Sequence, residues 1–478
     1  MLQVILTNID IFIVIIYLII TLFLGIFTGK NINNFKEYAI GKKKLPTIII
    51  SITVCATLIG GGSSLGTAAE VFKYGIIVMV AKYGVSIGAI LTAYFIIPRM
   101  SKFCDKISIG EIMGEMYGKH VRIITGIAGA LLCTGRIGAQ IMALGFVAKY
   151  FFGVSEVVGA IYGALIIIIY STIGGIRSVV FTDILQFSAL AITIPILLDI
   201  SLSSIGGYEK LIISLPQEKI TIFPNKQMFI KYIFVFVYMM IPMLSPPLVQ
   251  RILMSESTEQ AKKSFVFLAA TDIVFTTIAS FIGLVAYVTA PTTAPNESFL
   301  FLINQLDTGI KALAVIGILS VIMSTADSYL NSVSISIVHD VLAPINIIIS
   351  SDTKLFWSRV VTIITGLMAT LFAIYFENVF ELAIYSSNFW GPIVVGPLLL
   401  GLFNIKISKN ICIFSIICGI ITFILWEYYQ LKILTDIYSI IPAILINVSV
   451  SIIPIVIKNF NFKKNKKFND NKILKDFF

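Results

Sequence analysis

The sequence predicts an all-α protein that crosses a membrane about thirteen times. Of its 478 residues, 58% are hydrophobic and only 13% are charged, whereas a soluble domain has about 45–50% apolar and about 25% charged residues. The apolar runs are long enough for membrane helices, about 20 residues each, and they do not alternate as barrel strands do. A lipid bilayer is therefore the expected surrounding, and no nucleic-acid partner is expected.

The first predicted span runs from about Ile11 to Phe27. The other spans centre near residues 58, 87, 136, 163, 191, 239, 275, 322, 366, 392, 418 and 447. With the N-terminus outside, most of the 35 lysines and arginines fall in connections on the inner side. The positive-inside rule thus predicts an external N-terminus and a cytoplasmic C-terminus in the cell membrane, and it accounts for the net charge of +10.

Signatures of enzyme or metal chemistry are missing from the sequence. The five cysteines form no CxxC pair, and the two histidines share no metal-ligand spacing with them. No nucleotide-binding glycine loop, HExxH or GxSxG motif is present. We expect no catalytic residues, no cofactor and no metal other than a coupling ion.

Two predicted spans contain helix-breaking residues at mid-depth. The second span carries Gly60, Gly61 and Gly62, and each glycine costs a helix about 1 kcal/mol relative to alanine. The seventh span carries three prolines, which remove backbone donors; they are Pro242, Pro246 and Pro247. An unwound backbone at this depth must line a cavity or be buried in protein.

Each break opens a group of five spans, and a repeated unit of five spans must be inverted in the membrane. This predicts six segments, which are an N-terminal extra helix and cytoplasmic loop (1–45), a first repeat (46–202), an extracellular loop (203–228), a second repeat (229–403), two C-terminal helices (404–457) and a basic cytoplasmic tail (458–478).

The ninth span carries a polar stripe spaced by steps of four, three, four and three, which places it on one helix face. Its members are Ser320, Ser324, Asp327, Asn331 and Ser334, flanked by Thr325 and Ser328. Ligands that are all oxygen suit a hard cation such as sodium. The alternative is structural, with hydroxyls bonded to carbonyls one turn back.

The fourth span carries Arg136 and Gln140 one turn apart. An arginine stays charged when buried, so it needs an anionic partner. A substrate carboxylate is one candidate. A buried aspartate is the other, with Asp183 as the first choice.

Three segments resemble the sodium:solute symporter family over about residues 30–403. The glycine break with Lys73–Gly75 resembles the family's first core helix, residues 174–186 resemble its GG-x-x-x-V-x-x-T-D-x-x-Q signature, and residues 324–328 resemble its sodium-binding helix. The resemblance implies a LeuT-type fold, with two inverted five-helix repeats, one extra helix before them and two after.

The resemblance also implies ligands for sodium. They are the carbonyls of Ala56, Ile59 and Val321 and the hydroxyls of Ser324 and Thr325. Some members hold a second sodium ion near the aspartate that matches Asp183. Here Asp327 and Ser328 stand at positions where those members have serines, which leaves either a second sodium site or a proton site.

The resemblance to single subgroups is divided. Arg136 is placed like the carboxylate-binding arginine of sialic acid transporters, whereas the glycine run looks like that of choline transporters. Leu58 stands where the choline subgroup has an aromatic residue, and pantothenate transporters remain a third candidate. The implied substrate-binding residues are Thr57, Gly60, Ser63, Arg136, Gln140 and Ser245.

The predicted function is sodium-coupled symport of a small organic solute by alternating access. A carboxylate such as an organic or sugar acid is one candidate solute. Proton-coupled symport on the same fold is the first alternative, and a membrane sensor, which would need an output domain, is the second. We expect a monomer.

Overall fold

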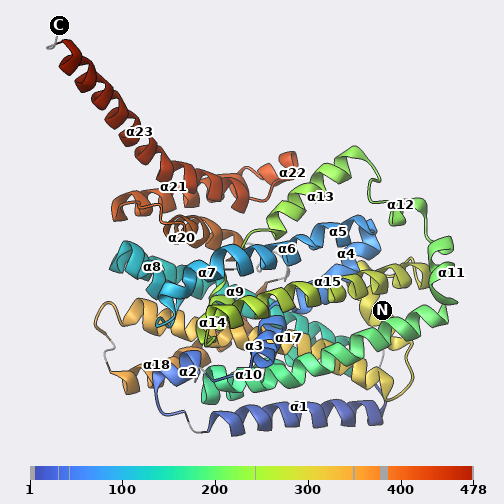
Figure 1. Cartoon of the computed structure of the whole chain (residues 1–478). Helices are drawn as coiled ribbons and strands as arrows, with labels where there is room; N and C mark the ends of the chain where they lie inside the picture. Colours follow the sequence, from blue (N-terminus) through green and yellow to red (C-terminus); the bar gives the residue numbers. More distant parts are fainter. Residues whose placement is uncertain are drawn as a thin grey trace.

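The computed structural model describes residues 6–475, apart from 31, 42–43, 243, 348–349 and 377–385, and side chains up to residue 457. Within these residues the chain is helical and contains no strand. Figure 1 shows α17 in the middle of the molecule, α1 along one edge, and α21 with α23 along the opposite edge. The architecture is therefore a bundle around one central helix.

The first part of the chain contains α1 (Asn8–Gly29), α2 (Phe35–Ile40), α3 (Thr47–Leu58), α4 (Gly61–Tyr74), α5 (Ile77–Lys82), α6 (Gly84–Leu91), η1 (Thr92–Ile96), α7 (Ile97–Met100), η2 (Ser101–Phe103), α8 (Ile109–Tyr117), α9 (Lys119–Phe152) and α10 (Glu156–Ser204). The second part contains α11 (Gly207–Ser214), α12 (Gln217–Ile220), α13 (Lys226–Met239), α14 (Pro246–Met254), α15 (Thr258–Thr289), η3 (Pro295–Glu297), α16 (Ser298–Asn304), α17 (Ile310–Ile335), η4 (Ser336–Leu342), α18 (Ser351–Tyr375), η5 (Gly391–Val395), α20 (Gly396–Leu402), α21 (Lys409–Tyr428), α22 (Leu431–Thr435) and α23 (Ile440–Lys475).

In the described residues, nine helices are long and apolar enough to cross a membrane, or ten if the bent pair α3–α4 is one span. This is fewer than the thirteen predicted. The two spans predicted near residues 163 and 191 are the two parts of α10, which meet at a kink where Gly175 is non-helical. The pair α13–α14 is interrupted, and the apolar helix over residues 386–402 is shorter than a full span.

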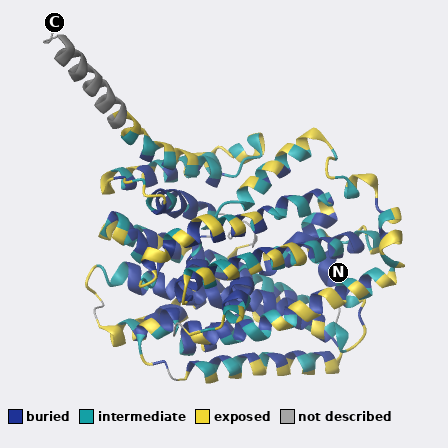
Figure 2. Cartoon of the chain, viewed as in Figure 1, coloured by how far each residue is buried: buried dark blue, intermediate teal, exposed yellow. Residues whose placement is uncertain are grey.

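Helix α17 is the core of the molecule. Every residue from Ala314 to Ile335 is buried, and α17 packs against α10, α9, α18, α1, α14 and α3. Figure 2 shows the buried residues gathered in this central region. The polar stripe of α17 therefore faces protein groups and not lipid.

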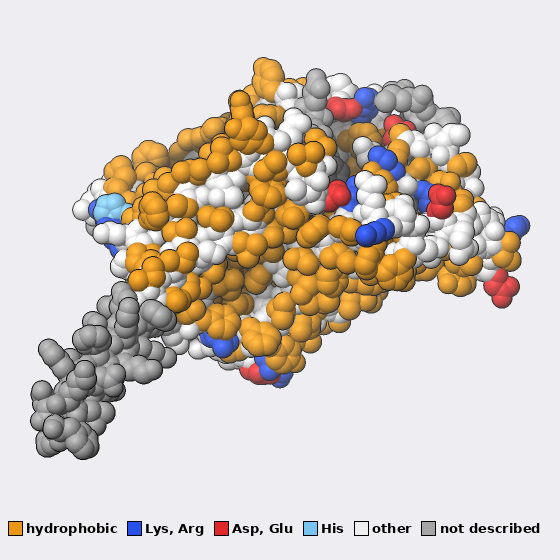
Figure 3. Space-filling model, turned by 90° about the horizontal axis from the view of Figure 1, so that it is seen from above, with side chains coloured by type: hydrophobic (Ala, Val, Ile, Leu, Met, Phe, Trp, Pro, Cys, Tyr) orange, Lys and Arg blue, Asp and Glu red, His pale blue; other side chains and the backbone are white. Residues whose placement is uncertain are grey.

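The outer surface is the opposite of this core. Large hydrophobic side chains such as Phe12, Phe23 and Phe27 of α1 are more than half exposed. Figure 3 shows hydrophobic side chains covering most of one face. A soluble protein rarely exposes so large an apolar area, whereas a lipid-facing surface requires it.

Helix α1 makes specific polar contacts with the core. The hydroxyls of Tyr17 and Ser320 lie 2.6 Å apart, and the Asp10 carboxylate accepts the Gly309 N–H at 2.7 Å where α17 begins. Near Gly175, the backbones approach so closely that a Cβ on Gly29 would lie 2.3 Å from the Cα of Gly174. This extra helix is therefore fastened to both α10 and α17.

Candidate functional site

The first predicted helix break is present. Helix α3 ends at Leu58 and α4 begins at Gly61, with a bend of 52° between them. Ile59 and Gly60 have non-helical backbone angles. A Cβ on Gly60 would lie 2.6 Å from the hydroxyl oxygen of Thr325, so glycine allows the unwound backbone to lie directly against α17.

The predicted sodium ligands meet at this break. The Ser324 hydroxyl donates to the Ala56 carbonyl at 3.0 Å and also lies 3.3 Å from the Val321 carbonyl. The Thr325 hydroxyl donates to the same Val321 carbonyl at 3.2 Å. Ile59 lies in the unwound segment itself. The cluster is made of neutral oxygen atoms, which are the ligands that a hard monovalent cation takes.

An open space adjoins the same break. Gly62 is exposed although it lies in the middle of a broken span, and a Cβ on it would meet no atom within 4 Å. A Cβ on its neighbour Gly61 would lie 3.3 Å from Oε1 of Gln140. Gln140 is buried, and this oxygen has no hydrogen-bond partner among the described residues.

Three further predicted substrate residues lie at the two helix breaks. Thr57 is buried and donates its hydroxyl to the Thr53 carbonyl at 2.7 Å. Ser63 donates to the Gly60 carbonyl at 2.8 Å, across the start of α4. Ser245 lies at the second break, directly before α14.

The described hydrogen-bond partner of Arg136 is a neutral side chain. The alternative that Arg136 pairs with a buried aspartate required an acid there. Its Nε and Nη2 atoms donate to the Ser387 hydroxyl at 3.1 and 2.7 Å. The hypothesis that Arg136 pairs with Asp183 is therefore wrong. The reason is that another arginine occupies that position.

The second break is also present, between the end of α13 at Met239 and the start of α14. Pro246 and Pro247 occupy the first positions of α14, where a helix needs no N–H donor and a fixed φ is favourable. These prolines restart a helix. Pro242 lies in the connection before it.

Arg251 on α14 is the site residue that the sequence analysis missed. It is fully buried, as are Asp183 and Asp327. Its Nη2 atom donates to the Ser328 hydroxyl at 2.7 Å and lies 3.5 Å from Oδ2 of Asp183. Arg251 stands four residues after Pro247, on the helix that the break restarts.

The two carboxylates have additional donors. Thr53 donates to Asp183, whereas Tyr170 and Thr182 donate to Oδ2 of Asp327 at 2.7 and 3.2 Å. Of the three residues predicted for a second cation or a proton, Asp183 and Ser328 contact Arg251, whereas Asp327 is bonded to Tyr170 and Thr182. The Thr57 and Ser328 hydroxyls, 3.2 Å apart, link these contacts to α3.

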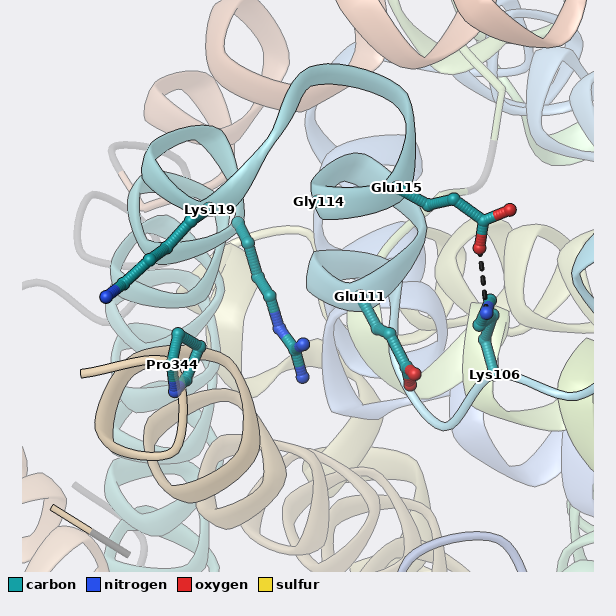
Figure 4. Close-up of a pocket in the computed structure, with 7 residues that line it drawn as sticks. Lys106, Glu111, Gly114, Glu115, Lys119 and Pro344 are labelled. Carbon is teal, nitrogen blue, oxygen red and sulfur yellow. Dashed lines mark ion pairs between the residues drawn. The ribbon is translucent and has the colours of Figure 1, made fainter. Parts of the chain in front are cut away.

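A second polar cluster surrounds the far end of α17. Arg122 contacts the Asp340 carboxylate at 3.3 Å and the His339 carbonyl at 2.9 Å, and the His339 ring lies 3.0 Å from Glu111. Burial raises the pKa of Glu111, but the hydrogen bonds with His339 and the Ile107 N–H outweigh this and lower it to about 2. Figure 4 shows the adjoining pocket of about 360 Å³, with Lys106 paired to Glu115.

The comparisons with known proteins agree with this geometry. The profile described as "Sodium:solute symporter family" matches residues 38–419. The chain belongs to the sodium:solute symporter family. Within the described residues, no group of three or more His, Cys, Asp or Glu side chains is arranged to hold a metal ion.

Two relatives are similar over most of their length. The sodium/sialic acid symporter NanT of Aliivibrio fischeri is 21% identical over 429 residues, which cover 84% of each chain. The high-affinity proline transporter PutP of Bacillus subtilis is 23% identical, over 88% of this chain and 92% of its own. These relatives agree with the family assignment, and this is a family of transporters, not of enzymes.

A solved structure establishes the fold. A Na+-coupled sialic acid symporter, in a substrate-bound outward-open state, matches 94% of this chain and 97% of its own with a TM-score of 0.81 and 21% identity. A nucleobase-cation-symport transporter in a closed conformation matches with a TM-score of 0.59. The protein has the predicted LeuT-type fold.

Proposed function

We propose that this protein binds sodium at the α3–α4 break and uses it to drive uptake of a small organic carboxylate. The carbonyls of Ala56, Ile59 and Val321 and the hydroxyls of Ser324 and Thr325 are the proposed ligands. The observation that carries the proposal is the 3.0 Å hydrogen bond from Ser324 to the Ala56 carbonyl. It joins an unwound helix end to an unbroken helix through atoms that a sodium ion could bind instead.

Sodium binding would replace this hydrogen bond with ligation of both oxygen atoms. The ion would hold the first broken helix against α17. This would fix the positions of the residues around the open space beside Gly62. Each sodium ion entering a cell gains about 2.3 kcal/mol for every 100 mV of membrane potential, which can drive solute accumulation. Alternating access would then release both inside.

The proposed orientation has the N-terminus outside and the C-terminus in the cytoplasm, in the cell membrane. The six segments predicted from the sequence give the proposed arrangement of repeats, with α3 opening the first and α13 the second. We propose that the transporter acts as a monomer.

Arg136 is the proposed recognition group for the substrate carboxylate, with Thr57, Gly60, Ser63, Gln140 and Ser245 around the solute. Its described partner, Ser387, is a neutral hydroxyl and does not neutralise the guanidinium. A forked guanidinium can donate two parallel hydrogen bonds to a carboxylate. The similarity to symporters named for sialic acid supports an acid.

The sodium site is tested by replacing Ser324 and Thr325 together with alanine. We expect the melting temperature of the purified native protein to rise in sodium chloride but not in choline chloride, and the double variant to lose this rise. The control is Ser334→Ala, because Ser334 lies on the same helix but donates to the Asn331 carbonyl. Full sodium stabilisation of the double variant would refute the site.

Proton-coupled symport is the second candidate, favoured by the buried carboxylates of Asp183 and Asp327. Reconstituted protein separates the two functions. Uptake of labelled sialic acid and proline is compared under an inward sodium gradient at equal pH and under an inward proton gradient in choline chloride. Uptake that follows only the proton gradient would favour this candidate and contradict sodium coupling.

A further inference from the structure

Helix α15 carries a buried acid that the proposed function does not use. Asp272 is 3% exposed and lies near the middle of α15, which is long and apolar enough to cross a membrane. Its Oδ2 atom accepts a hydrogen bond from the Ser86 hydroxyl at 2.6 Å. Among the described residues, Asp272 has no other hydrogen bond and no ion pair within 4.0 Å. Acids held inside membrane helices are costly and typically bind an ion or a proton.

The charges near Asp272 do not compensate it. Lys82 of α5 is close enough for its charge to act on Asp272. However, the Lys82 Nζ lies 3.7 Å from the Glu70 carboxylate of α4 and donates to the Thr67 hydroxyl at 3.0 Å. Lys82 and Glu70 cancel each other, so the ionised Asp272 adds one net negative charge to this region.

Other titratable groups near α15 do not offset this charge. The Cys55 thiol of α3 and the Tyr83 hydroxyl, which is bonded to α15, are neutral at physiological pH. Asp183 of α10, with Arg251 beside it, contacts Thr53 of α3. Thr53 and Cys55 are two positions apart and therefore lie on opposite sides of α3. Helix α3 thus separates that pair from the acid of α15.

Helix α15 runs beside both halves of the first broken helix. The Ser51 hydroxyl of α3 donates to the Ser264 hydroxyl of α15 at 3.1 Å. Further along, a Cβ on Gly283 of α15 would collide with the Ala68 carbonyl of α4. The two contacts fix how α15 is aligned with α3 and α4.

This alignment places Asp272 level with the break. Residues 59–60 are midway between the two contact residues of α3 and α4, and residues 273–274 are midway between those of α15. Neighbouring helices pack with their axes about 8–10 Å apart. The Asp272 carboxylate is therefore roughly 10 Å from the proposed sodium site, on the other side of the broken helix.

We propose that Asp272 is a proton-binding residue that sets the affinity of the sodium site, which is strong when the carboxylate is ionised and weaker when it holds a proton. This inference rests on the proposed sodium site at Ala56 and Ser324. Opposite charges about 10 Å apart inside a protein attract strongly enough to change ion affinity about tenfold. Because such coupling is reciprocal, sodium binding also releases the proton from Asp272.

Sodium titrations of the melting temperature, between about pH 5 and about pH 9, test the inference. The native protein is expected to need about tenfold more sodium for half-maximal stabilisation at the lower pH. Asp272→Asn keeps the shape without the charge and is expected to need about tenfold more sodium than the native protein at about pH 9. The matched control is Asp10→Asn, because Asp10 contacts Gly309, about four helical turns of α17 from Ser324. It is expected to titrate as the native protein does.

An Asp272→Asn variant with the native sodium requirement at about pH 9 would overturn the inference. If that variant does not fold, Ser86→Ala decides. It keeps the acid but removes a donor that favours the ionised form, so the pH at which sodium affinity falls is expected to rise. An unchanged pH would overturn the inference. Failure of the proposed function looks different, since Ser324→Ala with Thr325→Ala would then retain full sodium stabilisation.

Discussion

The two helix breaks lie against the same central helix, yet they present opposite chemistry to it. At the α3–α4 break, glycine lets an unwound backbone reach Ser324 and Thr325, and the atoms that meet are neutral oxygens. At the α13–α14 break, prolines restart a helix that carries Arg251 to Asp183 and Ser328. The first arrangement is made of neutral oxygen atoms, and the second contains a positively charged guanidinium.

The largest expected effect on stability comes from removing the buried guanidinium of Arg251. Arg251→Ala leaves buried acid uncompensated, and breaking a buried ion pair costs about 3–5 kcal/mol of stability. Unfolding of the variant in sodium-free buffer measures this loss. Arg136→Ala is the comparison, since Arg136 is only half-buried and bonds a neutral hydroxyl, and the expected loss of stability is smaller, about 1.5–3 kcal/mol. Equal losses of stability in the two variants would show that Arg251 is no more important for the fold than Arg136.

The next effect concerns substrate binding by Arg136, whose described partner is a neutral hydroxyl. Hydrogen bonds to a charged group contribute about 1.5–3 kcal/mol, so Arg136→Gln is expected to weaken binding of a carboxylate solute by about 10- to 100-fold. Calorimetric titration with an acid that binds the native protein measures the change. The sodium-dependent rise in melting temperature is expected to remain. Unchanged carboxylate affinity would exclude Arg136 as the recognition group.

A smaller effect separates neighbouring glycines of the first break. Gly60→Ala places a methyl group against the Thr325 hydroxyl, and such overpacking costs about 1–3 kcal/mol. We expect the sodium concentration for half-maximal thermal stabilisation to rise by about tenfold. Gly62→Ala enters open space and is expected to leave this concentration unchanged. Equal behaviour of the two variants would show that the close contact with Thr325 does not affect the ion site.

The smallest effect lies away from both breaks, at Glu111. Its pKa is lowered to about 2, so the ionised carboxylate stabilises the fold fully above its ordinary pKa of about 4.3, and this contribution is lost as the pH falls through about 2. Glu111→Gln is therefore expected to cost less than about 1 kcal/mol at neutral pH. The gap in melting temperature between native and variant should narrow between about pH 5 and pH 3. A difference in melting temperature that widens as the pH falls would contradict the lowered pKa of Glu111.

Much of the ion-site geometry could be predicted because it follows local rules. Helical spacing places Ser324 and Asp327 on one face of their helix. Three glycines identify where the facing helix unwinds. Arg251 could not be placed in the same way. A single arginine at the end of an apolar run looks like a loop residue. Its charged partner in the interior, Asp183, is 68 positions away in sequence. The choice between Arg136 and Arg251 as the partner of Asp183 depends on tertiary packing, which no local pattern reports.

The span count shows a similar limit. In α10 the sequence places the boundary between two spans at Gly174 and Gly175, and the structure has a kink between two helices at Gly175. Residues 386–402 look like a span by composition but form a helix too short to count as one. Apolar length predicts that a segment enters the membrane, but the continuity of each helix depends on the neighbours that satisfy its backbone.

The contact between Tyr17 and Ser320 has a consequence for how the protein is made. The two hydroxyls are separated by 303 positions in the chain. At a synthesis rate of about 5–20 residues per second, the ribosome reaches Ser320 roughly 15–60 seconds after Tyr17. During that interval α1 has been inserted but has no α17 to fasten to, and its apolar surface must be kept in place by lipid or by insertion factors. Helix α10, which begins at Glu156, is made earlier, so α1 can pack against α10 before its contact with α17 forms.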